Sequence, residues 1–568
     1  MPIALRCAGR RAKHTALFLA LSALLSALPA WSGAQSVLGV GDDATTVPRG
    51  VLRWRAVSEW LQYAERYGMN TPGRKNGALE PLAVNFGLDT LGLSQFATLA
   101  PLQSGIRTLA GMPDFVASLG KSVVQLRNQV QSTPLSLELG LTNRITIGAS
   151  VPFVTASANV SFAMNPKGIE GTLGFNPAFK LPSVLAQNGA LISQFDSAAS
   201  QLGRAIATCA ALPSAPGCTA INANAAAARA LIQSSTSFAT ALASVYGGRN
   251  GKTGALYVPT AGSTAQLAIA ARVAAFRTLY GAFGLTIAGN APGGAAPLTI
   301  TDAQRIFTDS AFGMGAKPLA TSITRGMGDV DFTIKVNLYD SFGRDTKKRL
   351  APNGFNIRQS IGGVYRLGTG TTDSPDDFTD IGTGNHQNDV ELRSYTDVMW
   401  GPHFWVSLVA KYNWQLADQL IMRITEAPSL PLAAAYRKQM VTRDLGDIAE
   451  LEINPRWSIT EHVSIAGQYT YRRKFNDQYT GSFAVNDLNG TPIIIDASAL
   501  NQETEAREHR FGGGISFSTL AAFERGEVSL PFEVSYLHFQ TTLGSGGAVP
   551  KLTQDQVQSR VYTRLFGR

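Results

Sequence analysis

Hydrophobic and polar residues alternate with a period of two over much of this chain. Between Leu135 and Leu141 every second residue is leucine, and the residues between them are polar or small. After a short turn at 142–144 the alternation resumes from Ile145 to Phe153. A period of two predicts a β-strand with one apolar and one polar face, and two such runs joined by a tight turn predict a β-hairpin.

The same pattern recurs along the chain, and short connections alternate with long ones. It predicts twelve strands, which begin near Val51, Leu135, Ile145, Asp329, Phe355, Val390, His403, Asp447, Val463, Thr504, Val528 and Gln556. An even number places both termini and all the shorter turns on one side of a membrane, and the long loops on the other. We therefore expect an all-β transmembrane fold, an antiparallel up-and-down β-barrel of 12 strands with a large Ala-rich helical extracellular insertion. If 115–131 crosses separately, the count becomes 14.

The first 34 residues have the three parts of a secretory signal. Arg6, Arg10 and Arg11 belong to a basic start, Ala16 to Leu28 is an apolar run, and small residues at 32–34 suit cleavage. The apolar run is short for a spanning helix of about 20 residues. We predict a signal peptide at 1–34, and a periplasmic N-terminal segment at 35–50.

The rest of the chain divides by composition. We expect a first barrel part at 51–159 with a long loop at 70–114, a helical insertion at 160–325, and a second barrel part at 326–568. Because lipid does not tolerate irregular backbone, the insertion must lie outside the membrane or in the lumen. It is either a cap on the extracellular face or a lid or plug that gates the lumen. Within it, Cys209 and Cys218 predict a disulfide at the tip of a helical hairpin, since no nearby His or second Cys pair favours a metal site.

If the apolar face of each strand contacts lipid, the other face lines the lumen, and that face is rich in charge. The lumen-lining candidates are Arg53, Arg55, Glu59, Glu138, Asp331, Lys335, Arg358, Glu391, Arg393, Asp397, Lys411, Glu450, Glu452, Arg456, Arg472, Arg510, Glu533, Arg560 and Arg564. A charge on the lipid face costs about 2–4 kcal/mol at mid-bilayer, so the orientation is strongly specified. Such a lumen is either a hydrated channel or a set of paired charges that keeps the barrel closed. Aromatic residues near strand ends, among them Trp54, Trp405 and Trp457, are expected at the two membrane interfaces.

Sites for catalysis, metals or cofactors are not indicated. His462 and Ser464 share a face, as in an outer-membrane phospholipase, but they lie at a periplasmic turn. Asp373, Asp376 and Asp380 fall in an acidic loop that lacks the spacing of an EF-hand, so a solvated loop is favoured over a Ca²⁺ site. The 49 Lys and Arg fall to 45 without the signal, against 40 Asp and Glu, and this small excess is no evidence for nucleic acid. We expect no enzyme activity, no metal, no cofactor and no nucleic-acid partner.

Several segments resemble the outer-membrane barrel family labelled "MetA-pathway of phenol degradation", which is related to the long-chain fatty-acid transporter superfamily. The similar segments are 137–153, the strand opening at 328–331, and the loop segments 366–370 and 380–384. The resemblance implies a passive outer-membrane transporter for small, often hydrophobic or aromatic compounds.

Together these patterns predict a porin-like channel or transporter in the cell outer membrane of a Gram-negative bacterium. Its expected partners are outer-membrane lipid, the outer-membrane assembly machinery and a small-molecule cargo. The alternative is a surface structural or interaction barrel with a plugged lumen, whose helical cap binds a partner.

Overall fold

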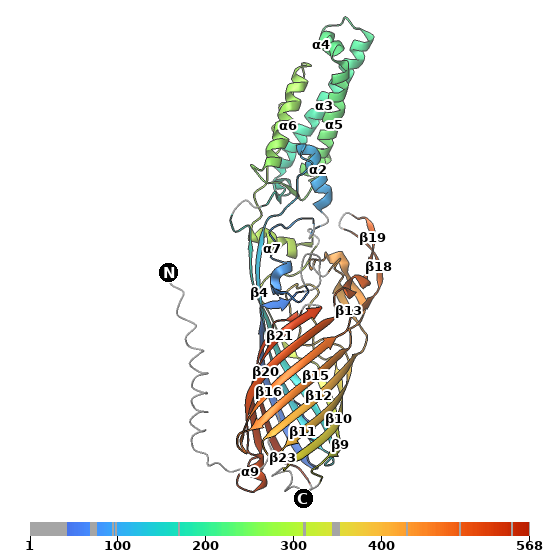
Figure 1. Ribbon diagram of the computed structural model, residues 1–568. Coiled ribbons are helices and arrows are strands. Elements are labelled where there is room, and N and C mark those ends of the chain that lie inside the picture. The colour runs from blue at the N-terminus through green and yellow to red at the C-terminus, as the bar shows by residue number, and fades with distance from the viewer. Residues whose placement is uncertain are drawn as a thin grey trace, which may run out of the picture.

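A computed structural model describes residues 42–68, 76–93, 96, 99–167, 171–310, 314–343, 353–427, 430–487, 490–546 and 549–566. The predicted signal peptide lies outside the described residues. The described chain forms a β-barrel with a helical head that stands above one end of it (Figure 1).

Twelve antiparallel strands form the barrel, as the sequence predicts. They are β1 (Val51–Tyr63), β4 (Ser122–Gly140), β5 (Ile145–Met164), β9 (Val330–Asp340), β10 (Phe355–Leu367), β11 (Asp389–Trp400), β12 (Phe404–Gln415), β15 (Ile448–Ser458), β16 (Val463–Lys474), β20 (Ala506–Ser518), β21 (Phe532–Gly546) and β23 (Thr553–Arg564). The ring closes because β1 pairs with both β4 and β23, and β4 pairs in turn with β5. A short strand, β8 (Ser322–Met327), continues the line of β9 along β5. Residues 122–131 are the upper part of β4, so the fourteen-strand alternative is wrong.

The connections separate as expected. The short turns, the short helix α9 (Leu520–Glu524) and the C-terminal end of the chain gather at one end of the barrel, which we call the periplasmic end (Figure 1). The helical head and the long loops lie at the opposite, extracellular end.

The outer surface of the barrel is apolar. Large side chains on alternate strand positions are 38–52% exposed there, including Ile147, Phe153, Ile334, Leu392 and Trp54. Their neighbours in sequence point inward, and many of these are polar and buried, such as Asp397 and Ser360 at 0%. An apolar exterior around a closed barrel matches a lipid bilayer, in which every backbone group must be paired within the protein.

The hairpin of β4 and β5 is far longer than a membrane crossing requires. The two strands have 19 and 20 residues, whereas about 9–11 residues span a bilayer. β1 pairs with β4 only as far as Asn128, and beyond that point the hairpin rises towards the head (Figure 1). It therefore connects the head to the barrel by continuous paired backbone.

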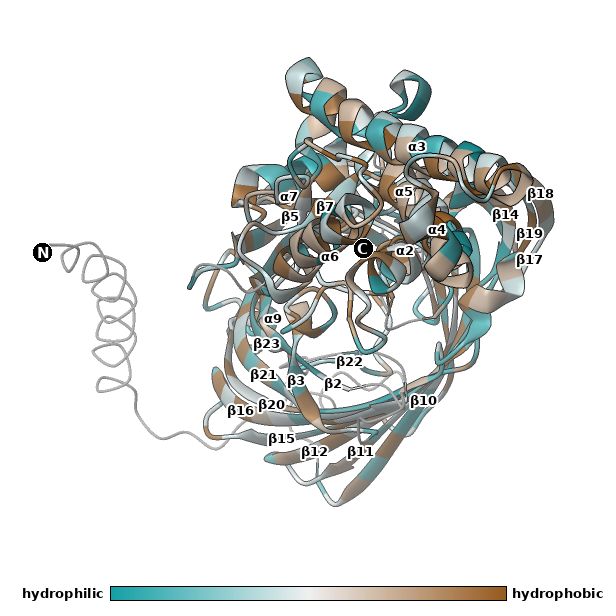
Figure 2. Ribbon diagram, turned by 90° about the horizontal axis from the view of Figure 1, so that it is seen from above, coloured by the Kyte–Doolittle hydropathy of each residue, from teal (hydrophilic) through white to brown (hydrophobic). Residues whose placement is uncertain are grey.

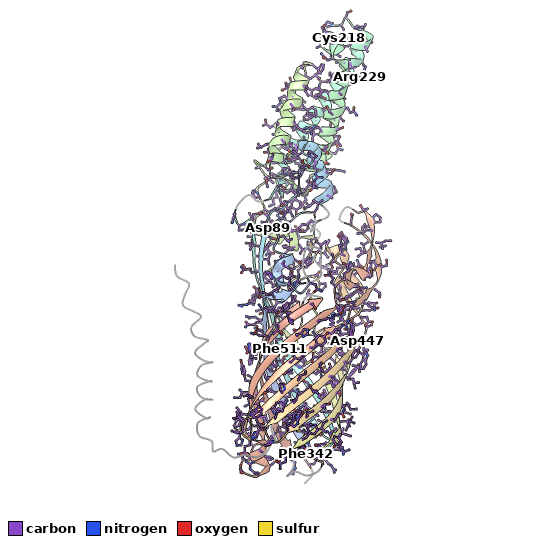
Figure 3. The ribbon with its side chains drawn as sticks, viewed as in Figure 1. Asp89, Cys218, Arg229, Phe342, Asp447 and Phe511 are labelled. Atoms are coloured by element: carbon purple, nitrogen blue, oxygen red, sulfur yellow. A yellow bond between two sulfur atoms is a disulfide. The ribbon has the colours of Figure 1, made fainter. Side chains whose placement is uncertain are left out.

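The head is a bundle of helices around one apolar core. Its elements are α2 (Ala100–Ala110), α3 (Pro182–Ala211), α4 (Cys218–Ala223), α5 (Ala225–Tyr246) and α6 (Thr264–Gly281). Phe195, Phe238 and Phe276 lie in mutual ring contact at 5.1–5.7 Å in its centre. The predicted disulfide between Cys209 and Cys218 is confirmed, and it joins the end of α3 to the start of α4 at the tip (Figure 3).

One helix of the head comes from a part of the sequence that composition did not assign to it. α2 belongs to the first long loop, yet Leu102, Ile106 and Leu109 are buried in the same core as α5 and α6. The head is thus assembled from two loops, not only from the predicted insertion at 160–325. Among the described helices, none is both long and apolar enough to cross a membrane.

Smaller elements surround the extracellular mouth of the barrel. They are β2 (Glu65–Tyr67), β3 (Leu79–Pro81), β6 (Leu173–Phe175), β7 (Tyr257–Pro259), α7 (Ile300–Thr308), β13 (Asp418–Arg423), β14 (Lys438–Asp444), β17 (Gln478–Thr480), β18 (Ser482–Asn486), β19 (Pro492–Asp496) and β22 (Val549–Pro550). Viewed from above, β2, β3 and β22 lie over the barrel opening, and β14, β17, β18 and β19 lie at one side of it (Figure 2). Buried Arg423 donates hydrogen bonds to the carbonyl oxygens of Met314, Pro375 and Ala433, and so ties three loops together.

Candidate functional site in the barrel interior

The interior of the barrel is the candidate site, because it gathers most of the charge that the sequence places on strands. Of the predicted lumen-lining residues, all but Arg564 are buried or half-buried. Arg564 lies at the end of β23 and is exposed. The strand pairing brings the others together in two groups, one above the other.

The group nearer the periplasmic end consists largely of arginine–carboxylate pairs. Arg53 on β1 pairs with Glu138 on the adjacent β4. Arg560 lies 3.7 Å from Glu533. Both pairs join neighbouring strands, so they stabilise the register of strand pairing and also neutralise buried charge.

A third arginine in this group contacts two carboxylates. Arg358 on β10 lies 3.4 Å from Asp340 and 3.6 Å from Asp397. Asp397 is fully buried, and it also accepts a hydrogen bond of 2.8 Å from the hydroxyl of Ser407.

The group nearer the extracellular end is centred on Lys411. Its ammonium group lies 2.9 Å from Glu450 and also contacts Glu452, both on β15. On β11, Arg393 pairs with Glu391. These contacts place two cations against three carboxylates, so most of the charge in this dense group is compensated.

Other predicted residues complete this upper group. Asp331 accepts a hydrogen bond of 2.8 Å from Arg366. Arg510 donates at 2.7 Å to Glu508. Glu59 and Arg472 lie close by: Glu59 faces Arg55 and Arg510, and Arg472 faces Glu450 and Glu508.

Part of the lumen is occupied by the chain that precedes β1. The sequence predicts a periplasmic segment at 35–50, but residues 42–50 lie against inward-facing side chains, and this part of the prediction is wrong. Ala44 N–H donates to both carboxylate oxygens of Asp397 at 3.1 Å, and its carbonyl accepts from Ser360 Oγ at 2.6 Å. Residues 35–41 lie outside the described residues.

Further contacts run along this segment, which we call the lumenal segment (residues 42–50). Asp42 lies 3.1 Å from Arg393. Lys335 donates to the carbonyl of Asp43 at 2.9 Å. The backbone of Val47 donates to Thr146 Oγ1 at 2.8 Å. The segment is therefore held mainly by polar contacts, with one small apolar contact of Ala44.

Aromatic residues also line the interior, and one of them was expected elsewhere. Trp405 was predicted at a membrane interface, but it is 4% exposed and points inward beside Met399 and Phe342. Figure 3 places Phe342 at the periplasmic end of the barrel. The guanidinium carbon of Arg456 lies 3.9 Å from the centroid of a Trp405 ring. Lys335 stands 4.1 Å above the Tyr395 ring.

Sequence reasoning missed several members of the site. Arg366, Asp389 and Glu508 have the same strand parity as predicted residues and extend these ion-pair groups. A complete count of inward positions would have found them. Asp42 and Asp43 carry no such signal, because they precede the first strand.

In the described residues, the side chains considered for catalysis or metal binding do not have the arrangement that either would need. The Nδ1 of His462 lies 3.0 Å from the carbonyl of Ser518, and its hydrogen-bonding partner is not Ser464. In the acidic loop, Asp373 accepts a backbone N–H from Gly382, and burial raises its pKa. Within the described ranges no three His, Cys, Asp or Glu side chains are grouped so that they can hold a metal ion.

No family model matches the chain, and no curated protein matches it either. The phenol-degradation family label therefore stays a prediction.

Solved structures of outer-membrane barrels align over most of the chain. An outer-membrane channel from Pseudomonas putida F1 aligns with 8% identity and a TM-score of 0.40, over 92% of this chain and 99% of that one. The translocator domain of the autotransporter NalP from Neisseria meningitidis gives 6% and 0.27, over 98% and 96%. The toluene transporter TbuX of Ralstonia pickettii gives 9% and 0.26, over 92% and 90%. Identities and TM-scores this low assign no function.

Proposed function

We propose that the protein is a passive channel of the cell outer membrane for small molecules. The observation that carries the proposal is the barrel interior: a wall of charged side chains encloses a segment that is not a strand. Barrels of about eight strands are filled by their own side chains, and larger ones leave room inside.

The charged wall suits a hydrated path better than an apolar one. Most of its charges are paired, across neighbouring strands or within one strand, so the wall presents polar surface to the lumen with little free charge. The lumenal segment is held mainly by hydrogen bonds and ion pairs, which water can replace when the segment moves. Displacement of residues 42–50 then opens the path between the two ends of the barrel.

The extracellular side offers an apolar entry surface. A groove of about 410 Å³ lies where β5 meets the segment before α7, lined by Met164, Pro297, Leu298 and Ile300 among others. It adjoins apolar residues of the head and of the barrel mouth, including half-buried Phe162 and buried Phe307. Such a surface suits hydrophobic or aromatic molecules, and we extend the proposal to them as cargo.

Osmotic swelling of liposomes that contain the full-length protein tests the channel. We expect slow entry of small uncharged sugars with the wild type, and an entry rate several-fold higher with Ser360→Ala, which loses the hydrogen bond to Ala44. Ser464→Ala is the matched control. It removes an inward Ser464–Ser516 hydrogen bond of 2.6 Å that does not touch the lumenal segment, so its rate should equal that of the wild type.

Deletion of residues 42–46 should give the fastest entry of all. If neither the wild type nor this deletion lets any solute pass while both migrate as folded barrels, the channel proposal fails. The alternative of a plugged barrel whose helical head binds a partner would then be favoured.

A further inference from the structure

One cation in the lower barrel differs from the others. Arg456 on β15 is 3% exposed, and none of its three guanidinium nitrogens has a hydrogen-bond partner. In the same interior Arg53, Arg358 and Arg393 each have a carboxylate within 4 Å. A buried charge without a partner is strongly unfavourable, so this position is suited to a ligand that the chain itself does not supply.

The two neighbours of Arg456 across the sheet contain no acceptor. Trp405 is opposite on β12, and its ring covers one face of the guanidinium at 3.9 Å. Ala466 is opposite on β16 and has only a methyl group. Neither residue directly opposite Arg456 therefore offers an acceptor to the nitrogen edge of the guanidinium.

The charged groups that face Arg456 from other elements are Asp43, Asp397, Glu533 and Arg560. Each carboxylate among them is engaged elsewhere. Asp397 binds Ala44 N–H and Ser407, Glu533 accepts from Tyr562 at 2.6 Å, and Asp43 accepts from the backbone N–H of Thr45 at 2.9 Å.

Two further donors next to Arg456 also have no partner. They are the indole Nε1–H of Trp405 and the hydroxyl of Ser458, each in a side chain that is 4% exposed. Ser458 lies two residues from Arg456, on the same inward face of β15. Three unsatisfied donors, one of them charged, thus belong to one small area of the wall, and an anion with several acceptor atoms satisfies such a set.

Apolar surface adjoins these donors. Trp405 packs with Phe342 and Met399 in a buried cluster at the periplasmic end. A bidentate guanidinium edge recognises a carboxylate, and an apolar or aromatic body suits the cluster beside it.

We infer that Arg456, Trp405 and Ser458 form a binding site for a small organic carboxylate with an apolar or aromatic body. The site lies on the periplasmic side of the lumenal segment. Asp397 and Ser407 hold Ala44, and the next inward pair towards the periplasmic turn is Met399 and Trp405. The role of this site in binding cargo before its release rests on the proposed channel function. Binding at the site can nevertheless be measured without transport.

Trp405 provides a local reporter of binding. The other tryptophans of the described chain, at 54, 60, 400, 414 and 457, are 40–51% exposed on the lipid-facing side, where detergent covers them. The fluorescence of the full-length protein in dodecyl maltoside minus that of Trp405→Phe isolates the inward ring. Iodide serves as an anionic quencher, acrylamide as a neutral quencher, and benzoate as the competing carboxylate.

We expect iodide to quench Trp405, and saturating benzoate to reduce that quenching at least threefold. Arg456→Gln should lower the iodide quenching constant by a similar factor and leave acrylamide quenching unchanged, whereas Arg456→Lys should retain part of it. Arg507→Gln is the matched control. It removes an exposed arginine at the other end of the barrel and should behave as the wild type.

Equal iodide quenching in the wild type and in a folded Arg456→Gln protein would overturn the site. So would a wild type whose iodide quenching is unaffected by benzoate, a result that does not depend on any variant folding. A failure of liposome swelling alone would overturn the channel but not the carboxylate site, so the two failures are distinguishable.

Discussion

The head and the barrel interior solve the problem of burial in opposite ways. The head surrounds an apolar core with small and polar residues, and Phe238, Leu242 and Ile269 are at most 2% exposed. The barrel surrounds a charged interior with an apolar exterior, and Asp397, Glu452 and Arg456 are at most 5% exposed. Water around the head and lipid around the barrel account for this inversion.

The two kinds of core depend on different interactions. In the head, stability comes from area removed from water and from close packing, which tolerate exchange between apolar side chains of similar volume. In the barrel interior most charges, Arg456 excepted, are paired with an opposite charge, so the loss of one partner leaves the other buried and uncompensated. Mutations should therefore have different consequences in the two regions.

The largest effect is expected in the head. Phe238→Ala removes a ring that contacts both Phe195 and Phe276, and it should destabilise the bundle by about 4 kcal/mol. Thermal unfolding followed by circular dichroism at 222 nm should show an earlier helical transition while the barrel transition stays in place. Leu267→Ala is the control, since Leu267 is 58% exposed. A joint shift of both transitions would show that the two regions unfold as one unit.

The next effect tests the charged interior. Lys411→Met leaves Glu450 and Glu452 next to each other without their shared cation, and we expect a loss of about 3 kcal/mol. Denaturant unfolding in micelles measures it. Lys551→Met removes an exposed pair with Glu65 at 2.9 Å, and it should change the unfolding midpoint little. Equal shifts for the two variants would mean that the interior is as well hydrated as the surface.

The sequence predicted the part of each region that depends on local pattern. Alternation with a period of two located the strands, their number and their inward face, because lipid specifies that face residue by residue. The disulfide was predictable from Cys209 and Cys218, which are close in sequence. Trp405 was misplaced because its aromatic character was given more weight than the parity it shares with Ser407 and Asp397.

The parts that were missed depend on contacts between distant residues. Ala44 meets Asp397 across 353 positions of the sequence, and nothing in 35–50 alternates in a way that reveals this. α2 joins the head because its apolar face fits α5 and α6, although another loop contains it. Arg456 is unpaired because of the residues that lie opposite it on the adjacent strands. The identity of those residues is known only once the strand register is known.

The smallest predicted effect concerns the loops at the barrel mouth, between the two regions. Burial raises the pKa of Asp376, but hydrogen bonds and charge from Lys438 and Arg423 outweigh it and hold this pKa below the ordinary value of 3.8. A lowered carboxyl pKa gives stability that is present above about pH 4 and is lost as the pH falls further. Hydrogen exchange of 418–444, corrected for intrinsic rates, should therefore speed up between pH 5 and pH 3.

Two variants of the same loop separate this effect from general acid unfolding. Asp376→Asn should exchange faster than the wild type at pH 5 and lose most of the pH dependence. Burial raises the pKa of Asp373, so that its charged form opposes folding above pH 4 and its titration acts in the opposite direction. Asp373→Asn should then steepen the loss of protection between pH 5 and pH 3. If both variants flatten the pH dependence of hydrogen exchange equally, the ion pairs of Asp376 do not hold the mouth loops in place. Other contacts between the head and the barrel would then stabilise these loops.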